Sequence, residues 1–347
     1  MATAARDAVV RCPLCGSADG AALGRSRHGV LVRCGGCALA YHPALVVAGA
    51  PGQQPSLVPQ DDEGQGKAAA PGAGLGESPA TSAVAPYYGD DAAYAAYRAR
   101  KEPQWEELFR RLRGYLRGRA GGAWRLLDVG CARGYSTAVA RRLGFAAHGV
   151  EPSAADAAYA RERLGLPVDT GTVEQASFAP ASFDAVVMWS VLEHLTVPQA
   201  TFAAIARLLR PGGMLNIFTP NGASRAARAQ GPAWAEYNRA GHVALYAPAS
   251  VRWLLSAHGL VPLEIYTTLW GEKGAGEEGN RREGAAAIRT RPLTCLPLHL
   301  FGVALRRAVM RPRLAPLRAT GRRMLAVVAP RAALAGEYMG VYARKRG

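Results

Sequence analysis

The stretch LLDVGCARG, residues 126–134, decides the fold. An apolar run ends at Asp128, and glycines follow at a spacing that suits a tight turn from a strand into a helix. Twenty-three residues after Asp128, a second apolar run over 146–150 ends at Glu151. Glycines let the backbone approach a ligand closely, and a carboxylate at the end of the next strand binds ribose hydroxyls. The two runs predict an α/β unit that binds a nucleotide-like ligand.

The loop lacks the pattern of a phosphate-binding site. A dinucleotide fingerprint reads G-x-G-x-x-G and a P-loop reads G-x-x-x-x-G-K-[ST], whereas this loop has Gly130, Ala132 and Gly134 at alternate positions. The spacing resembles the first motif of class I S-adenosylmethionine (SAM) methyltransferases, in which an acidic residue precedes G-x-G-x-G. SAM has a sulfonium, an amino acid end and a ribose, so it needs no phosphate site. Ala132 stands at the position of the middle glycine.

Three later stretches extend this resemblance. Glu151-Pro152-Ser153 resembles the ribose-binding strand end of the family, SFDAVVMWSVLEHL (182–195) its fourth strand, and LLRPGGML (208–215) the helix, turn and strand that follow. We expect the residues around Gly212 to form that turn. The resemblance implies the class I methyltransferase fold, an α/β Rossmann-like mixed seven-stranded sheet, over residues 87–347.

The order of apolar runs indicates the same architecture. Strand-like runs at 126–129, 146–150, 185–189 and 214–218 alternate with helical segments, which is typical of a parallel sheet covered by helices on both faces. A faint strand is expected at 166–169. We read 263–268 and 338–344 as the last two strands, and helix-like residues from Tyr87 to Arg119 as a leading helical segment.

Ligands of such sheets bind at the carboxyl ends of the strands. The resemblance therefore implies that SAM is the cofactor, that Glu151 accepts hydrogen bonds from its ribose hydroxyls and that Glu174 lies near its adenine. The expected cofactor-binding residues are Asp128, Gly130, Cys131, Gly134, Glu151, Glu174 and Trp189.

Two histidines are candidates for catalysis. A hydroxyl or amine acceptor must lose a proton, and histidine is the side chain that most often removes one near neutral pH. His194 follows the fourth predicted strand, and His242 lies in a region from Trp234 to Tyr246 that resembles part of the zinc-ribbon-bearing methyltransferases acting on small molecules or sugars. A structural histidine bonded to backbone is the alternative for each. His258 is read as a helix-end residue and His148 as a strand residue.

Four cysteines have the spacing of a metal site. Cys12-x2-Cys15 and Cys34-x2-Cys37 form two knuckles separated by eighteen residues, which matches a structural zinc site. Disulfides are the competing interpretation, and the lack of a signal-peptide-like start makes them less favoured. We expect a zinc-ribbon-like domain over residues 1–47, in which zinc supplies much of the folding energy. His28 and His42 are read as ordinary surface or packing residues.

Composition divides the remaining chain. Residues 48–86 are read as a disordered linker, because positions 49–86 hold seven Gly and six Pro but no aromatic residue. The formal charge is +16 over 347 residues, and +13 of it lies from Arg281 onward. An Arg-rich insertion at about 272–336 is therefore expected, and it suits an anionic lipid surface, a substrate lid or a solvated helical pair.

These features favour a SAM-dependent methyltransferase, cytoplasmic or membrane-associated, that acts on a small molecule or on a sugar or glycan. A ribosomal RNA methyltransferase is the first alternative, but nucleic acid is not favoured as a partner, because the basic residues gather late in the chain rather than around the expected cleft. The second alternative is a non-catalytic scaffold with a relict cofactor domain, which Ala132 would support. Peripheral membrane contact would run through the Arg-rich insertion.

Overall fold

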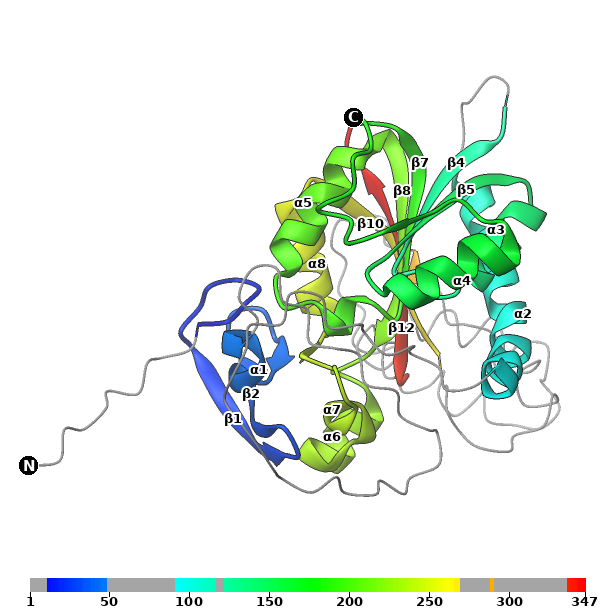
Figure 1. Cartoon of the computed structure of the whole chain (residues 1–347). Coiled ribbons are helices and arrows are strands. Elements are labelled where there is room, and N and C mark those ends of the chain that lie inside the picture. Colours follow the sequence, from blue (N-terminus) through cyan, green and yellow to red (C-terminus); the bar gives the residue numbers. More distant parts are fainter. Residues whose placement is uncertain (1–10, 49–90, 117–121, 269–287, 290–335) are drawn as a thin grey trace, which may run out of the picture.

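Two sheets organise the part of the chain that the computed structural model describes, residues 11–48, 91–116, 122–268, 288–289 and 336–347 (Figure 1). The larger sheet has the strand order β11-β10-β12-β8-β7-β4-β5-β6. Its strands are β4 (Trp124–Val129), β5 (Phe145–Glu151), β6 (Val168–Thr170), β7 (Phe183–Trp189), β8 (Leu209–Pro220), β10 (Leu260–Thr268), β11 (Ile288–Arg289) and β12 (Tyr338–Lys345).

The direction of the strands confirms the expected mixed sheet. Strands β6, β5, β4, β7 and β8 are parallel, and β12 lies antiparallel between β8 and β10. The two-residue strand β11 adds an eighth strand at the edge of the predicted seven. All seven expected strands are therefore present, including the faint one at β6.

Helices cover both faces of the sheet because successive residues of its central strands point in opposite directions. Leu126 packs in a cluster with Phe109 of α2, whereas Leu127 packs in a cluster with Phe202 of α5 and Leu254 of α8. Figure 1 shows α2, α3 and α4 on one side of the strands and α5 and α8 on the other. The helices are α2 (Asp91–Tyr115), α3 (Tyr135–Arg142), α4 (Ala154–Leu164), α5 (Pro198–Leu208) and α8 (Pro248–Ala257).

The smaller sheet belongs to the cysteine-rich region. Its strands β1 (Gly20–Ser26), β2 (Gly29–Cys34) and β3 (Ala40–Tyr41) are followed by α1 (Pro43–Ala48). A fourth strand, β9 (Ala244–Leu245), pairs with β3 in the order β1-β2-β3-β9. The chain thus returns about two hundred residues later to complete the ribbon sheet, which the sequence analysis did not anticipate.

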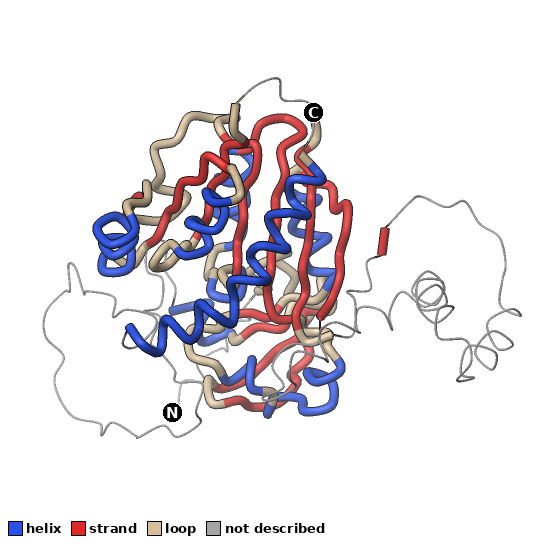
Figure 2. The backbone as a smooth tube through the Cα atoms, turned by 90° about the vertical axis from the view of Figure 1, so that its right-hand side faces the viewer, coloured by secondary structure: helices blue, strands red, loops and turns tan. Residues whose placement is uncertain are grey.

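Three short elements connect the two sheets. They are α6 (Arg225–Gln230), the 3₁₀ turn η2 (Gly231–Ala233) and α7 (Ala235–Asn238), all between β8 and β9. In Figure 1, α6 and α7 lie beside β1, α1 and β2, below the large sheet, and Figure 2 shows the same group at one end of the strands. We call residues 222–246 the bridging segment.

The expected turn around Gly212 is an irregularity within β8. Leu209 pairs with Phe183 and Met214 with Ala185, so the residues between Leu209 and Met214 leave the ladder with β7, and Gly212 is left-handed with a φ of 74°. His258 ends α8 and His148 lies in β5, as expected. Residues 49–86 and nearly all of 272–336 lie outside the described residues. None of the described helices combines the length and apolarity needed to cross a membrane.

Candidate active site and metal centre

The predicted cofactor residues meet at one edge of the large sheet. The parallel strands β4, β5 and β7 end at Val129, Glu151 and Trp189, and the loop of residues 130–134 leads from β4 into α3. Parallel strands bring their carboxyl ends to the same edge, where open α/β sheets bind their ligands. The predicted clustering of the loop, Glu151 and Trp189 is therefore what the topology produces.

The loop uses left-handed backbone at alternate residues. Gly130, Ala132 and Gly134 have φ angles of 68°, 48° and 81°. A Cβ at Gly130 would lie 2.6 Å from Val191 Cγ2, and one at Gly134 would lie 2.7 Å from Leu166 Cδ1. Both glycines are thus required by conformation and by space. Ala132 adopts the same conformation with a methyl group, so it is a strained residue in the middle of the loop.

Glu151 is tied to this loop from the neighbouring strand. One carboxylate oxygen accepts a hydrogen bond from the Ala132 amide at 2.8 Å, and the other accepts one from the Ser153 amide at 2.8 Å. The residue is only 5 % exposed. Burial raises the pKa of Glu151 to about 7, although both amide bonds oppose that shift. The carboxylate is thus held beside the loop, with a charge state that changes near neutral pH.

Asp128 and Cys131 support the loop from beneath. The Asp128 carboxylate accepts hydrogen bonds from Ser136 Oγ at 2.5 Å and Thr137 Oγ1 at 2.8 Å, in the first turn of α3. Burial raises the pKa of Asp128 to about 6 and that of Cys131 above its ordinary value. The Cys131 thiol packs on Gly149, where a Cβ would lie 2.5 Å from its sulfur. Both side chains shape the loop from within the protein interior.

Glu174 and Trp189 have different surroundings. Glu174 is exposed, and its carboxylate accepts a hydrogen bond from Thr201 of α5. Trp189 stacks on Phe218 with ring centroids 4.2 Å apart, and Phe218 stacks on Tyr338 at 5.5 Å. The Trp105 ring of α2 meets Trp189 edge-on at 6.4 Å. A row of aromatic rings therefore crosses the carboxyl ends of β7 and β8, next to the loop.

The two candidate catalytic histidines are in contact. Their rings meet edge to face with centroids 4.8 Å apart. His194 Nδ1 lies 2.9 Å from the Gly241 carbonyl oxygen, and His242 Nδ1 lies 2.9 Å from that of Glu236. A carbonyl oxygen only accepts, so each Nδ1 carries the proton and each Nε2 carries a lone pair.

Burial keeps this pair uncharged. It lowers the pKa of His194 to about 4 and the pKa of His242 well below its ordinary value. Glu193, the residue before His194, accepts a hydrogen bond from Thr219 Oγ1 at 2.9 Å, and burial raises the pKa of Glu193 to about 8. At pH 7 the histidines are neutral bases and Glu193 is protonated. The backbone bonds of both rings match the structural interpretation of each histidine, and the catalytic role of each stays a prediction.

A polar residue that the sequence analysis missed completes this cluster. Glu236 is 7 % exposed, its Oε1 accepts a hydrogen bond from the Tyr338 hydroxyl at 2.9 Å, and Arg239 binds both of its oxygens. The Nδ1 atom of His242 lies 3.6 Å from Glu236 Oε2. The only sequence signal was an acidic residue six positions before a histidine, which is too common to single out.

The four ribbon cysteines converge as their spacing predicts. Their sulfurs lie within 4.8 Å of one another, with Cys12 Sγ 3.6 Å from Cys37 Sγ and Cys15 Sγ 3.5 Å from Cys34 Sγ. Four thiols on two tight turns are the donor set of a closed, tetrahedral structural zinc site. Hydrogen bonding from the Cys37 thiol lowers the pKa of Cys12, which favours the thiolate form that binds a metal ion. The cluster therefore fits zinc.

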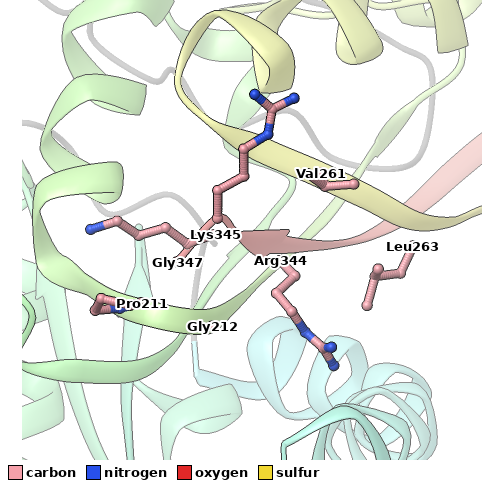
Figure 3. Close-up of a pocket in the computed structure, with 8 residues that line it drawn as sticks. Pro211, Gly212, Val261, Leu263, Arg344, Lys345 and Gly347 are labelled. Atoms are coloured by element: carbon pink, nitrogen blue, oxygen red, sulfur yellow. The ribbon is translucent and has the colours of Figure 1, made fainter.

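A shallow hollow at the opposite end of β8 is not a comparable site (Figure 3). It lies between Pro211, Leu263 and the end of β12. Two of its three cations are used by the fold, since Lys345 Nζ donates to the Leu209 carbonyl at 2.7 Å and Arg344 donates to the Tyr115 carbonyl at 3.0 Å. The polar cluster and the glycine loop both lie at the other edge.

Comparison with known proteins agrees with this geometry. Residues 94–265 match the family described as a methyltransferase domain. The matched range includes the loop, Glu151 and both histidines, whereas the ribbon cysteines precede it.

Curated relatives resemble the same part of the chain. The ubiquinone biosynthesis O-methyltransferase of Rhizobium rhizogenes is 32 % identical over 108 residues, which cover 30 % of this chain and 44 % of that protein. The enzyme of the same name from Klebsiella pneumoniae is 35 % identical over 116 residues, which cover 31 % and 48 %. The chain thus spans less than half the length of these relatives.

Among solved structures, a SAM-dependent methyltransferase of Thermotoga maritima, described as a possible histamine N-methyltransferase, covers 74 % of this chain and 95 % of its own. It is 16 % identical, with a TM-score of 0.47.

The strained Ala132 gives a direct test of the loop geometry. Ala132→Gly removes the steric cost of a left-handed alanine but makes the unfolded chain more flexible. We expect the first effect to be larger, so that the free energy of unfolding rises by about 0.5–1 kcal/mol. Urea denaturation measures the change. As a control, Ala138→Gly in the middle of α3 should lower the same quantity by about 0.5–1 kcal/mol. Destabilisation by Ala132→Gly would contradict the left-handed assignment.

Proposed function

We propose that the protein is a SAM-dependent methyltransferase whose acceptor is a hydroxyl group on a small molecule. The observation that carries the proposal is the glycine loop of β4 joined by hydrogen bonds to Glu151 of β5, within a matched methyltransferase domain. The names of the curated relatives support transfer to oxygen. A free or carrier-linked sugar is one form of such an acceptor.

The loop and Glu151 would hold the cofactor. Left-handed backbone at Gly130 and Gly134 lets the chain approach the ligand closely, and Glu151 would accept hydrogen bonds from both ribose hydroxyls. Asp128 and Cys131 would keep the loop in place from beneath. SAM supplies a methyl group that its sulfonium activates for displacement, so the protein has to align the acceptor and exclude water.

The histidine pair would prepare the acceptor. His194 follows the carboxyl end of β7, and its Nε2 lone pair would take the hydroxyl proton as the oxygen bonds to the methyl carbon. His242 would hold the His194 ring through their edge-to-face contact. The stacked rings of Trp189 and Phe218 would provide an apolar wall beside the acceptor.

Cofactor binding should depend on pH through Glu151. Only the ionised carboxylate accepts both ribose hydroxyls, and with its pKa at about 7 the SAM Kd should rise about tenfold between pH 8 and pH 6. Calorimetric titration at both pH values measures this. Glu151→Gln should weaken binding and remove the pH dependence, whereas Glu162→Gln on the exposed side of α4 should leave both unchanged. Tight, pH-independent binding to Glu151→Gln would refute the assignment.

The role of the histidines is tested by turnover. His194→Ala should lower kcat about 10²–10⁴-fold, because a positioned general base contributes about that factor. The SAM Kd should change less than about twofold, since the loop and Glu151 are untouched. Transfer of labelled methyl to a panel of phenols and sugar nucleotides gives the rate, with His258→Ala at the end of α8 as the matched control. Full activity in both His194→Ala and His242→Ala would exclude histidine catalysis in this site.

A further inference from the structure

The bridging segment, residues 222–246, lies between the ribbon and the carboxyl ends of the parallel strands of the large sheet. On its ribbon side, β9 pairs with β3 in the register Ala40 with Leu245 and Tyr41 with Ala244. The same segment carries Glu236 and His242 of the polar cluster. The β3–β9 hydrogen bonds, followed by the backbone of the segment, therefore connect the ribbon to the candidate active site.

Several polar contacts hold the segment to the ribbon. The Arg27 amide donates to Asn238 Oδ1 at 2.8 Å, and His28 Nε2 lies 3.1 Å from the Arg239 carbonyl oxygen. Arg33 donates to the Gly222 carbonyl at 3.3 Å. Each contact comes from β2 or from the turn that precedes it, between the two cysteine knuckles. The ribbon thus binds the segment from its first residues through α7.

His42 is the most buried of these contacts. It is fully buried, and its Nε2 lies 3.1 Å from the Tyr237 carbonyl oxygen, so Nε2 donates. Its backbone amide donates to the Val243 carbonyl at 3.2 Å. His42 lies five residues after Cys37 and directly after β3. It is therefore no ordinary surface residue but a joint between the ribbon and the residues that flank His242.

Apolar packing reinforces the joint. Leu31 and Ala40 of the ribbon share one buried cluster with Trp234, Tyr237 and Leu245 of the segment. This burial is what small metal domains otherwise lack, since about forty residues enclose little core of their own. The ribbon and the segment are therefore one packed unit rather than two.

The other side of the segment contacts the candidate base. The Val243 amide donates to the Glu193 carbonyl at 2.9 Å, and the Gly241 carbonyl accepts from His194 Nδ1 at 2.9 Å. Tyr246 is fully buried and belongs to the same buried cluster as Cys12 and Cys37 of the ribbon and Leu192, the residue before Glu193. The core that contains Tyr246 is thus shared by the cysteine knuckles and the chain next to Glu193.

From these contacts we infer that the cysteine cluster positions the transfer site: zinc held by Cys12, Cys15, Cys34 and Cys37 fixes the ribbon, and His42 and β3 then fix His242 against His194. His42 is a positioning residue in this scheme. The inference rests on the proposed function only in treating the histidine pair as part of that site. The cofactor loop lies on β4 and β5, outside these contacts, so metal loss should act on the histidine side alone.

The test compares the zinc-loaded protein with protein stripped by a chelator, using hydrogen exchange of backbone amides. Metal removal should lower amide protection over 243–246 at least tenfold and leave 126–129 within about twofold. SAM affinity by calorimetry should stay within about twofold, and added zinc should restore protection. Unchanged protection over 243–246, or equal loss over 126–129, would overturn the inference.

A variant that keeps all four cysteines makes the test independent of ribbon unfolding. His42→Ala should retain one zinc per chain by elemental analysis, yet lower protection over 243–246 and lower kcat with the KM for SAM unchanged. His42→Gln retains a donor for the Tyr237 carbonyl and should restore part of both. Val30→Ala, at an exposed position of β2, is the matched control. Hydrogen exchange in His42→Ala that equals that of the wild type would overturn the role of His42. If neither the wild type nor any variant binds SAM but the exchange results are as expected, only the proposed function is refuted.

Discussion

The pairing of β3 with β9 holds the histidine side of the site in place. Only two residue pairs form it, Ala40 with Leu245 and Tyr41 with Ala244. A two-residue ladder is weak by itself, and it persists because His42 and the apolar cluster around Tyr237 bury it. Without it, the ribbon would still bind the bridging segment through Arg27, His28 and Arg33, but β9 would no longer be held against β3. The hydrogen bonds of Val243 to Glu193 and of Gly241 to His194, just before β9, would then be weakened.

Burial sets the protonation states of Glu193 and His194, which contact the bridging segment. The pKa of Glu193 is raised to about 8 and that of His194 is lowered to about 4, so both groups are uncharged at neutral pH. The two shifts make stability change with pH in opposite directions. As pH falls from about 6.5 towards 4, the unfolded chain binds a proton at His194 that the folded chain does not bind. The free energy of unfolding therefore falls over this range. As pH rises from about 4.5 to 8, Glu193 is ionised in the unfolded chain but still protonated in the folded one. The free energy of unfolding therefore falls over this range too.

Much of the large sheet was predictable because its information is local. Strands buried on both faces read as apolar runs, and the turn after Asp128 has glycines where the backbone is left-handed. The cysteine cluster was predictable because its spacing alone identifies a metal-site geometry. The predictions failed where a strand is very short or where its partner strand is distant in the sequence. Strand β9 has two residues and a partner two hundred positions away, and the burial of His42 follows from that pairing.

A crystal structure with zinc and S-adenosylhomocysteine would show the cofactor loop, the histidine pair and the cysteine cluster together. We expect both ribose hydroxyls on the Glu151 carboxylate, the product sulfur facing Trp189 and His194, and one zinc ion on the four cysteines. This expectation would be contradicted by a ligand bound away from the loop of residues 130–134, or by a ribose that makes no contact with Glu151.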